Sequence, residues 1–180
     1  METIANGAFR NAGLKSVKTG DGLAKISAEA FAGNKALATV VLGKNVEKLG
    51  VDAFKDCVAL AKLELPASLN DFSAASFNGC TALAGITVAA GNKAYKAVGE
   101  TIYTADGKTL VMVTSKNSTL IMIADGTEVI AEGAFDVAAN VTTIMFPETL
   151  ISVKARALDV TNWYATQNGI VYIGSLVYGA

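Results

Sequence analysis

The 180-residue chain contains no histidine, two cysteines and two prolines, and aromatic residues make up 7% of it. Without an imidazole, Ser-His-Asp and Cys-His nucleophile systems are excluded. Most catalytic zinc sites and the non-haem iron triad also need histidine as a ligand. The acidic residues stand singly, without a calcium-loop pattern or a matched carboxylate pair for glycoside hydrolysis. We therefore expect no enzyme activity, no cofactor and no metal site.

Charge of one sign and long apolar runs are also scarce. The 15 Lys and Arg nearly balance the 16 Asp and Glu, whereas a nucleic-acid-binding domain normally carries a basic face. The mean hydropathy of +0.40 would suit a membrane protein. No apolar run, however, approaches the roughly 18 to 20 residues of a transmembrane helix. We expect neither nucleic-acid binding nor membrane insertion by this chain, and no signal peptide is visible at its N-terminus.

The apolar residues that are present recur at a nearly fixed period. An Ala-Phe pair stands at residues 8–9, 30–31, 53–54 and 134–135, with Ser76-Phe77 and Ala157-Leu158 as variants. A period of about 23 residues is the sequence signature of stacked repeats, because one such unit cannot bury its apolar face alone. Other apolar columns keep the same period: Leu14, Leu37, Leu60 and Leu83; Val17, Val40, Leu63 and Ile86; Leu23, Val46 and Leu69; Ile26, Leu49 and Phe72.

Each unit contains two recognisable pieces. The first is I-x-L-P and its variants, at residues 40–43, 63–66, 86–89, 121–124 and 144–147. Apolar residues at alternate positions are typical of a short strand with one buried face. The second piece is the Ala-Phe segment, which suits one or two helical turns. The repeat therefore predicts a long, thin core filled by rows of Leu, Ile, Val and Phe.

One unit closely resembles a known family. Residues 53–66 follow the pattern A-F-x-x-C-x-x-L-x-x-L-x-L-P, which is similar to the BspA-type leucine-rich repeats of bacterial surface proteins. The resemblance covers most of the chain and departs at Ser76, at Leu158 and at an interruption. It implies an α/β fold class: a right-handed leucine-rich-repeat solenoid of about 23-residue units with a parallel sheet on one face. It also implies an extracellular, cell-surface setting and a role in adhesion or host contact.

The interruption lies between Phe77 and Phe135, which are more than two repeat periods apart. Residues 101–105 and 108–114 read as strands, and Asp106-Gly107 between them predicts a hairpin turn in which both residues have positive φ. Because solenoids normally carry polar caps, we also interpret the chain as a fragment of a longer array. We expect leucine-rich repeats at 1–90, a β-hairpin insertion between repeats at 91–119, resumed repeats at 120–161, and the start of a second, truncated hairpin-like unit at 162–180.

Cys57 and Cys80 occupy one repeat column, a single period apart. They should lie on adjacent turns about 5 Å apart, if the strand spacing sets their distance. A disulfide between them is geometrically conceivable. The alternative is a pair of buried thiols that act as small apolar side chains. The spacing leaves both arrangements open.

Two groups of residues are candidates for contact with a partner. The middle side chain of each I-x-L strand points to the open sheet face, and that row ends in an apolar patch of the kind that can mark a protein contact. With residues just before the strands, the candidate partner-binding face consists of Lys18, Thr39, Val41, Lys62, Glu64, Thr87, Met122, Thr143 and Met145. The candidate aromatic patch, which either binds carbohydrate or seals the hairpin onto the solenoid, consists of Tyr95, Tyr103, Trp163 and Tyr164.

These patterns favour a non-catalytic interaction module of a bacterial cell-surface protein that binds a host or surface protein through the exposed sheet face. One alternative is a structural spacer in a longer surface array. The other is a carbohydrate-binding module that uses the hairpin aromatics. The repeat columns explain the stacking of the units and leave the identity of a ligand open.

Overall fold

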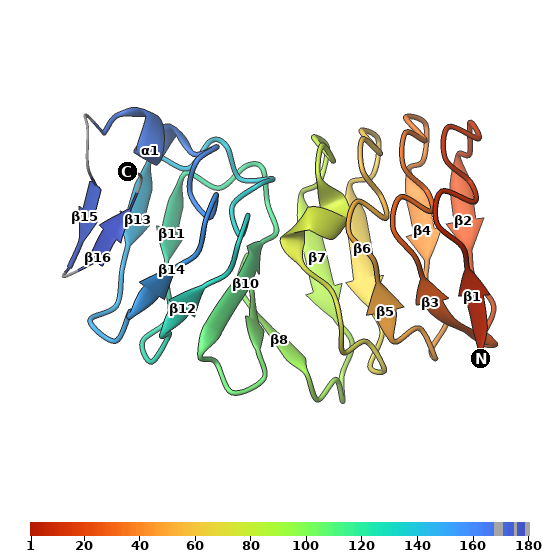
Figure 1. The fold of residues 1–180 in the computed structure, drawn as a ribbon, viewed down its shortest axis with the longest axis horizontal. Coiled ribbons are helices and arrows are strands. Elements are labelled where there is room, and N and C mark those ends of the chain that lie inside the picture. The colour runs from red at the N-terminus through yellow and green to blue at the C-terminus, as the bar shows by residue number, and fades with distance from the viewer. Residues whose placement is uncertain (168–170, 175, 179–180) are drawn as a thin grey trace.

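The computed structural model is an elongated stack of chain turns that lie side by side along one axis (Figure 1). It describes residues 1–167, 171–174 and 176–178. These residues make about seven turns of about 23 residues, with mostly parallel strands and little helix. The predicted fold class, a leucine-rich-repeat solenoid interrupted by a hairpin, is confirmed.

The strands predicted from the I-x-L pattern lie along one side of the stack and form the first strand row. Most of them have a central apolar residue buried between exposed neighbours, as in the strand that contains Val40, whereas Val17 in the first strand is only partly buried. Paired strands are parallel and in register, so that Val17 lies opposite Val40 and Ile121 opposite Ile144. The first strand row consists of β2 (Ser16–Lys18), β4 (Thr39–Val41), β6 (Lys62–Leu65), β7 (Gly85–Val88), β11 (Leu120–Met122) and β13 (Thr143–Met145).

A second row of mainly parallel strands also runs along the stack, and of its strands only β10 (Thr109–Val113) was predicted from the sequence. It is built around buried residues such as Ile26, Leu49 and Ile130, with Ile26 opposite Leu49. Several of its strands are two residues long, which is too short for the alternation that reveals a strand. The second strand row consists of β1 (Glu2–Ile4), β3 (Leu23–Ile26), β5 (Lys48–Leu49), β10 (Thr109–Val113), β12 (Val129–Ile130) and β14 (Ser152–Val153).

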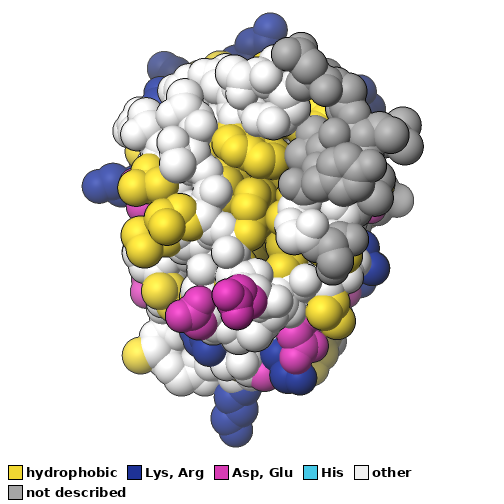
Figure 2. Space-filling model, turned by 90° about the vertical axis from the view of Figure 1, so that its left-hand side faces the viewer, with side chains coloured by type: hydrophobic (Ala, Val, Ile, Leu, Met, Phe, Trp, Pro, Cys, Tyr) yellow, Lys and Arg dark blue, Asp and Glu magenta, His cyan; other side chains and the backbone are white. Residues whose placement is uncertain are grey.

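The predicted apolar columns line the interior of the stack. Leu37, Leu60 and Leu83 have no exposed surface. At the end of the stack that carries β13, apolar side chains are visible in the middle of the face, next to backbone and uncharged polar side chains (Figure 2). The first turn is more open, because Phe9 is 43% exposed whereas Phe31 in the second turn is 2% exposed.

The Ala-Phe segments form hydrogen-bonded turns instead of the expected helical turns. The Phe31 N–H donates to the carbonyl of Ala53, and the Phe54 N–H donates to that of Ser76. Because these donors bond to the next turn of the stack, they do not form the i to i−4 bonds of an α-helix. Among the described residues, regular helix is confined to the 3-10 turn η1 (Ala74–Phe77) and to α1 (Asn162–Ala165). The phenylalanine rings stack with centroids 5.4, 5.4 and 5.8 Å apart in the series Phe9, Phe31, Phe54 and Phe77.

The interruption supplies the three antiparallel strands β10, β9 (Thr101–Thr104) and β8 (Tyr95–Val98), which form one end of a five-stranded sheet that continues through β12 and β14. The predicted hairpin is confirmed as β9 and β10, whereas β8 was not predicted. The predicted two-residue turn is wrong: Gly107 has a φ of +80° but Asp106 lacks a positive φ. The Gly107 N–H instead donates to the carbonyl of Thr104, which makes a longer turn that ends in a glycine.

The spacing of equivalent residues along the chain shows how this sheet fits into the repeat. The step from Ile86 to Leu110 is more than twice as long as the equivalent step from Val40 to Leu49. The following step, from Leu110 to Ile121, is instead three residues shorter than its equivalent from Leu49 to Leu63. The interrupted turn has therefore gained a segment on the hairpin side and lost three residues on the Ala-Phe side.

The same sheet forms a wall across the core. Thr101, Ile102 and Tyr103 are buried in succession, so both faces of β9 are covered. Ile102 packs with the apolar cluster of the first turns, whereas Tyr103 packs with that of the last turns. Strand β10 belongs to the wall and also pairs in parallel with β12. The hairpin segment therefore divides one solenoid into two packed stacks.

At the far end of the chain, β15 (Val171–Ile173) and β16 (Leu176–Tyr178) pair antiparallel. They follow α1 and lie in the segment predicted as a second hairpin-like unit. Residues 168–170, 175, 179 and 180 of that segment lie outside the described residues. The proposed boundaries of the four segments stay a prediction.

Candidate functional site

The outward side chains of the first strand row lie on one surface, which we call the strand face. All nine predicted residues of the partner-binding face are exposed there. Whether this surface binds a partner stays a prediction at this point. The register places its side chains in pairs across neighbouring strands: Lys18 beside Val41, Glu64 beside Thr87, and Met122 beside Met145.

The most exposed apolar side chains of the strand face lie on β11 and β13. Leu120, Met122 and Met145 are 49%, 67% and 53% exposed, respectively. Thioether side chains are flexible and polarizable, so they adapt to irregular partner surfaces. Apolar side chains that gather on a surface mark contact sites more often than isolated ones do.

A shallow groove of about 350 Å³ lies by the carboxyl ends of β4 and β6. Val41, Pro66 and Ala67 supply an apolar lining, while Lys44 and Glu64 supply one charge of each sign. The groove therefore combines aliphatic surface with balanced charge. That composition suits an uncharged or mixed peptide surface better than a strongly charged ligand.

The strand face is interrupted between β7 and β11. Both strands belong to the first strand row and lie in successive turns, but β7 pairs with β6 and β11 pairs with β13. Strands β4 and β6 are also in separate sheets, yet they lie against each other, whereas β7 and β11 stand apart (Figure 1). The sequence pattern predicts Thr87 and Met122 as neighbours in one row. The structure instead separates the methionine pair from the four N-terminal strands of the row.

The four aromatic residues proposed as one patch pack in different places. The Tyr95 ring meets the Phe72 ring edge-on at 4.8 Å, and its hydroxyl accepts the Phe72 N–H. Tyr103 is 1% exposed, and its hydroxyl accepts a backbone N–H. Trp163 and Tyr164 are partly buried against the apolar cluster of the last turns. These are the contacts of packing residues, as in the alternative that the aromatics seal the hairpin onto the solenoid, and Tyr103 presents no free ring face to a ligand. Carbohydrate binding by the remaining aromatics stays a prediction.

Cys57 and Cys80 are buried free thiols, so the disulfide alternative does not hold in this structure. Their Sγ–H groups donate to the carbonyls of Phe31 and Phe54, at 3.3 and 3.1 Å. Burial raises the pKa of Cys57 to about 11 and that of Cys80 to about 12. Since the thiolate is the reactive form, these thiols have little nucleophilic character. Asn34 precedes them in the same repeat column, and its side-chain amide also donates to backbone carbonyls. The side chains of this column therefore satisfy backbone carbonyl groups of the Ala-Phe segments.

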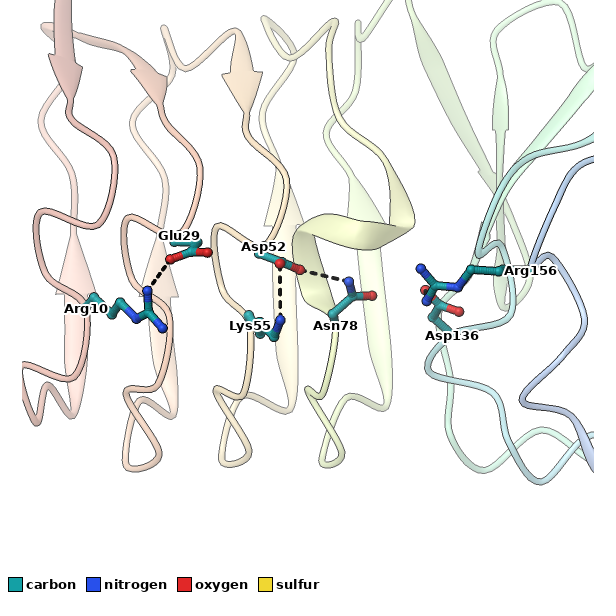
Figure 3. Close-up of polar contacts among 7 residues, drawn as sticks. All are labelled: Arg10, Glu29, Asp52, Lys55, Asn78, Asp136 and Arg156. Atoms are coloured by element: carbon teal, nitrogen blue, oxygen red, sulfur yellow. Dashed lines mark hydrogen bonds and ion pairs between the residues drawn. The ribbon is translucent and has the colours of Figure 1, made fainter.

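On the Ala-Phe edge of the stack, polar side chains link neighbouring turns (Figure 3). Arg10 pairs with Glu29 of the next turn. The Asn78 amide donates to Asp52 of the preceding turn at 2.8 Å, and Lys55 also meets Asp52, at 3.3 Å. The donors are the residues that follow the phenylalanine column, and the acceptors stand two residues before it. These contacts form a polar ladder along the edge.

Asp136 continues the polar ladder with the opposite charge. It follows Phe135 as Arg10 follows Phe9, and its Oδ2 lies 3.7 Å from Nη2 of Arg156 in the next turn. The Asp136 side chain is 8% exposed, and no group in the described part of the chain donates a hydrogen bond to its Oδ1.

The charges around Asp136 oppose one another. Burial raises the pKa of the Asp136 carboxyl, Arg156 lowers it, and the neighbouring carboxylates Asp159 and Glu132 raise it further. Asp136 is not among the residues predicted from the sequence. The signal that could have found it is the change of sign along one repeat column, from Arg10 to Asp136.

Neither a metal cluster nor a membrane-spanning helix is found in the described residues. Within them, no group of three or more Cys, Asp or Glu side chains could hold a metal ion. None of the helices in that part of the chain is long and apolar enough to cross a membrane.

Comparison with known proteins places these features in a family. A family model described as a BspA type leucine rich repeat region matches residues 2–101 and 112–174 in six copies. No curated protein matches the chain in sequence.

Solved structures with the same fold come from bacteria. A leucine-rich cell surface protein from Faecalibacterium prausnitzii matches with a TM-score of 0.71 and 25% identity, over 82% of this chain and 39% of that protein. A leucine-rich repeat protein from Eubacterium ventriosum matches with a TM-score of 0.54 and 14% identity, over 82% and 52% of the two chains. The pneumococcal vaccine antigen PcpA matches with a TM-score of 0.52 and 17% identity, over 76% and 51%. The chain thus spans about two fifths of the first protein and about half of the other two.

Proposed function

The chain belongs to the BspA-type leucine-rich repeat family, and from this premise we propose that it is a non-catalytic interaction module of a bacterial cell-surface protein. Repeat modules of this kind occur in surface proteins, as the Faecalibacterium protein illustrates. In this proposal the module lies outside the cell, and the strand face meets a host protein or another surface protein. The observation that carries the proposal is the methionine pair, Met122 beside Met145, each more than half exposed on a paired sheet.

The packing beneath this pair supports a role in binding. Ile121 and Ile144, the residues between the outward side chains of β11 and β13, are buried in the apolar cluster of the last turns. The backbone under the methionines is therefore held by the core and by the parallel pairing of the two strands. A rigid backbone lowers the entropy that a surface loses on association. The flexible methionine side chains can still adapt to the partner.

A matched pair of variants tests the strand face. We would immobilise the whole chain and measure binding of purified host matrix and serum proteins by biolayer interferometry. For a protein that binds saturably, Met145→Asp should weaken binding at least about tenfold, because a charge then enters an apolar contact. Ile151→Asp is the control, since Ile151 is 64% exposed and lies off the strand face. It should change the affinity less than about twofold.

Two results would contradict the proposal. Equal losses from Met145→Asp and Ile151→Asp would remove the strand face as the contact surface. The absence of saturable binding to every probe, together with binding by a longer protein that contains this chain, would favour the structural spacer.

A further inference from the structure

Three side chains of the polar ladder bring an amine, a carboxamide and a carboxylate together. Nζ of Lys55 donates to Oδ2 of Asp52 at 3.3 Å, and Nδ2 of Asn78 donates to Oδ1 of the same carboxylate at 2.8 Å. Figure 3 shows Lys55 and Asn78 pointing to Asp52, the first from the same turn and the second from the next turn. The Asp52 side chain is only 17% exposed. One partly buried carboxylate therefore holds two groups that could react with each other.

The backbone places Lys55 and Asn78 side by side. They occupy the same position of successive repeats, directly after the phenylalanines whose rings stack at 5.8 Å. The Asp56 N–H donates to the Asn78 carbonyl at 2.8 Å, so the two turns are hydrogen-bonded next to both side chains. The flexible four-carbon stem of a lysine is long enough to cross from one turn to the next. The equivalent residues of the other described turns are Arg10, Ala32, Asp136 and Asp159, so an amine adjoins a carboxamide at one place of this column.

Asp52 keeps its carboxylate at a backbone position that favours glycine. Its φ is +58°, and Gly7 and Gly133 occupy the equivalent position in other turns with φ of +62° and +63°. Glu29 and Arg156 also stand at this position with positive φ. Each of the three charged residues contacts a side chain of an adjacent turn. Because a left-handed conformation is strained for a residue with a Cβ, such a residue persists where its side chain is used or its surroundings impose it.

The three groups are the reactants and the acid–base residue for an amide bond between side chains. Asp52 takes a proton from the Lys55 ammonium, and the neutral amine attacks Cγ of Asn78. The bond from Cγ to Nδ2 breaks as Asp52 gives the proton to Nδ2, and ammonia leaves as ammonium with one proton of the attacking nitrogen. One ammonium and one carboxamide thus give one secondary amide and one ammonium ion, without any other reactant. The fixed neighbourhood of the two turns replaces a bimolecular encounter.

We propose that Lys55 and Asn78 form an isopeptide bond from Nζ to Cγ, with Asp52 as the general base and then the general acid. The bond ties the third turn of the stack covalently to the fourth. It lies on the Ala-Phe edge and not on the strand face, so it stands or falls independently of the proposed function. Since the attack needs the neutral amine, the bond forms faster at pH 9 than at pH 7.

The test measures the intact mass of the whole chain after incubation at pH 9. We expect a mass lower by that of one ammonia molecule, and a branched tryptic peptide in which residues 49–62 are joined to residues 63–93. Lys55→Arg keeps the positive charge but lacks the amine, so this variant should keep its full mass. A succinimide formed by Asn78 with the Gly79 amide would lose the same mass without Lys55. Equal mass loss in Lys55→Arg would therefore overturn the proposal.

A matched pair of carboxylate variants tests the role of Asp52. Asp52→Asn has nearly the same shape, and asparagine tolerates positive φ. It should form the bond at least about tenfold more slowly, because the proton carrier is lost. Asp56→Asn is the control, since Asp56 is an exposed carboxylate of the same turn with a φ of +56°, and it should form the bond at the unsubstituted rate.

Three results would each overturn the proposal: full mass of the unsubstituted chain after incubation, absence of the branched peptide, or equal rates for Asp52→Asn and the unsubstituted chain. The Met145→Asp variant should form the bond normally, which separates this reaction from binding at the strand face.

Discussion

Replacing Phe54 by alanine tests whether the stacked phenylalanine column holds the turns together. Phe54 has no exposed surface, and its ring stacks between Phe31 at 5.4 Å and Phe77 at 5.8 Å. Removal of a buried phenylalanine costs about 3–5 kcal/mol of the free energy of unfolding, because apolar burial is lost and a cavity remains. Since two rings lose a stacking partner, we expect about 4 kcal/mol. Phe54→Leu keeps most of the volume and should cost about 1.5 kcal/mol.

Phe9 offers a matched control in the same column. It stacks on Phe31 at 5.4 Å, but 43% of its surface is exposed. Because the space left by Phe9→Ala opens to water, no closed cavity forms and less apolar burial is lost. We expect a cost of about 1 kcal/mol for this variant.

Urea unfolding of the whole chain, followed by circular dichroism, measures both effects. With a slope of about 2 kcal/mol per molar, the midpoint should fall by about 2 M for Phe54→Ala and by about 0.5 M for Phe9→Ala. Equal shifts for the two variants would refute the reasoning, because they would show that burial within the stack does not set the contribution of a phenylalanine.

Three other predictions concern buried polar groups. The fold raises the pKa of Asp136, so its contribution to stability is present below the unfolded value of 3.8 and is lost as the pH rises through the folded value. In thermal unfolding, the free energy of unfolding of Asp136→Asn should therefore be closest to that of the unsubstituted chain at pH 3. By pH 8 the variant should be more stable by about 1 kcal/mol. A stability gain that does not change with pH would contradict this cause. Ser76 stands at a position that is alanine in other repeats, and its buried hydroxyl has no hydrogen-bond partner among the described residues. Ser76→Ala should therefore raise the free energy of unfolding, measured in urea, by about 1 kcal/mol. A loss of stability would show that the hydroxyl has a partner. Cys57 and Cys80 should resist alkylation by iodoacetamide in the native chain, and both should be alkylated in denaturant without a reductant. If the intact mass shows that neither thiol is alkylated in denaturant, the two cysteines form a disulfide.

The repeat made the core and the first strand row predictable from sequence. Val40 and Leu63 stand in one column of the repeat and also belong to an alternating pattern, so two independent periods point to the same buried position. Apart from β10, the second strand row escaped prediction because a strand as short as Lys48–Leu49 contains no alternation. This row forms because every turn of the chain passes along this side of the solenoid, where its backbone can hydrogen-bond to the backbone of the neighbouring turn.

The candidate sites were less predictable, because they depend on where the repeat is broken. Thr87 and Met122 occupy equivalent positions of successive turns, yet they lie on separate sheets. Tyr103 looked like a surface aromatic, but β9 is covered on both faces. Asp136 looked like one more acidic residue. Its buried Oδ1, which no group in the described part of the chain donates to, can be recognised only in the folded structure.

The wall formed by β8, β9 and β10 alters the stack on both of its sides. Its extra residues separate β7 from β11, which isolates the methionine pair from the rest of the strand face. Its shortened return to Ile121 lies beside a cavity of about 210 Å³ on the Ala-Phe edge, which Lys116 and Asp136 help to line. An uninterrupted stack of equal turns would present one continuous row of side chains on each side. Because the wall interrupts the stack on both sides between the same two sets of turns, the chain departs most from its own repeat at this junction.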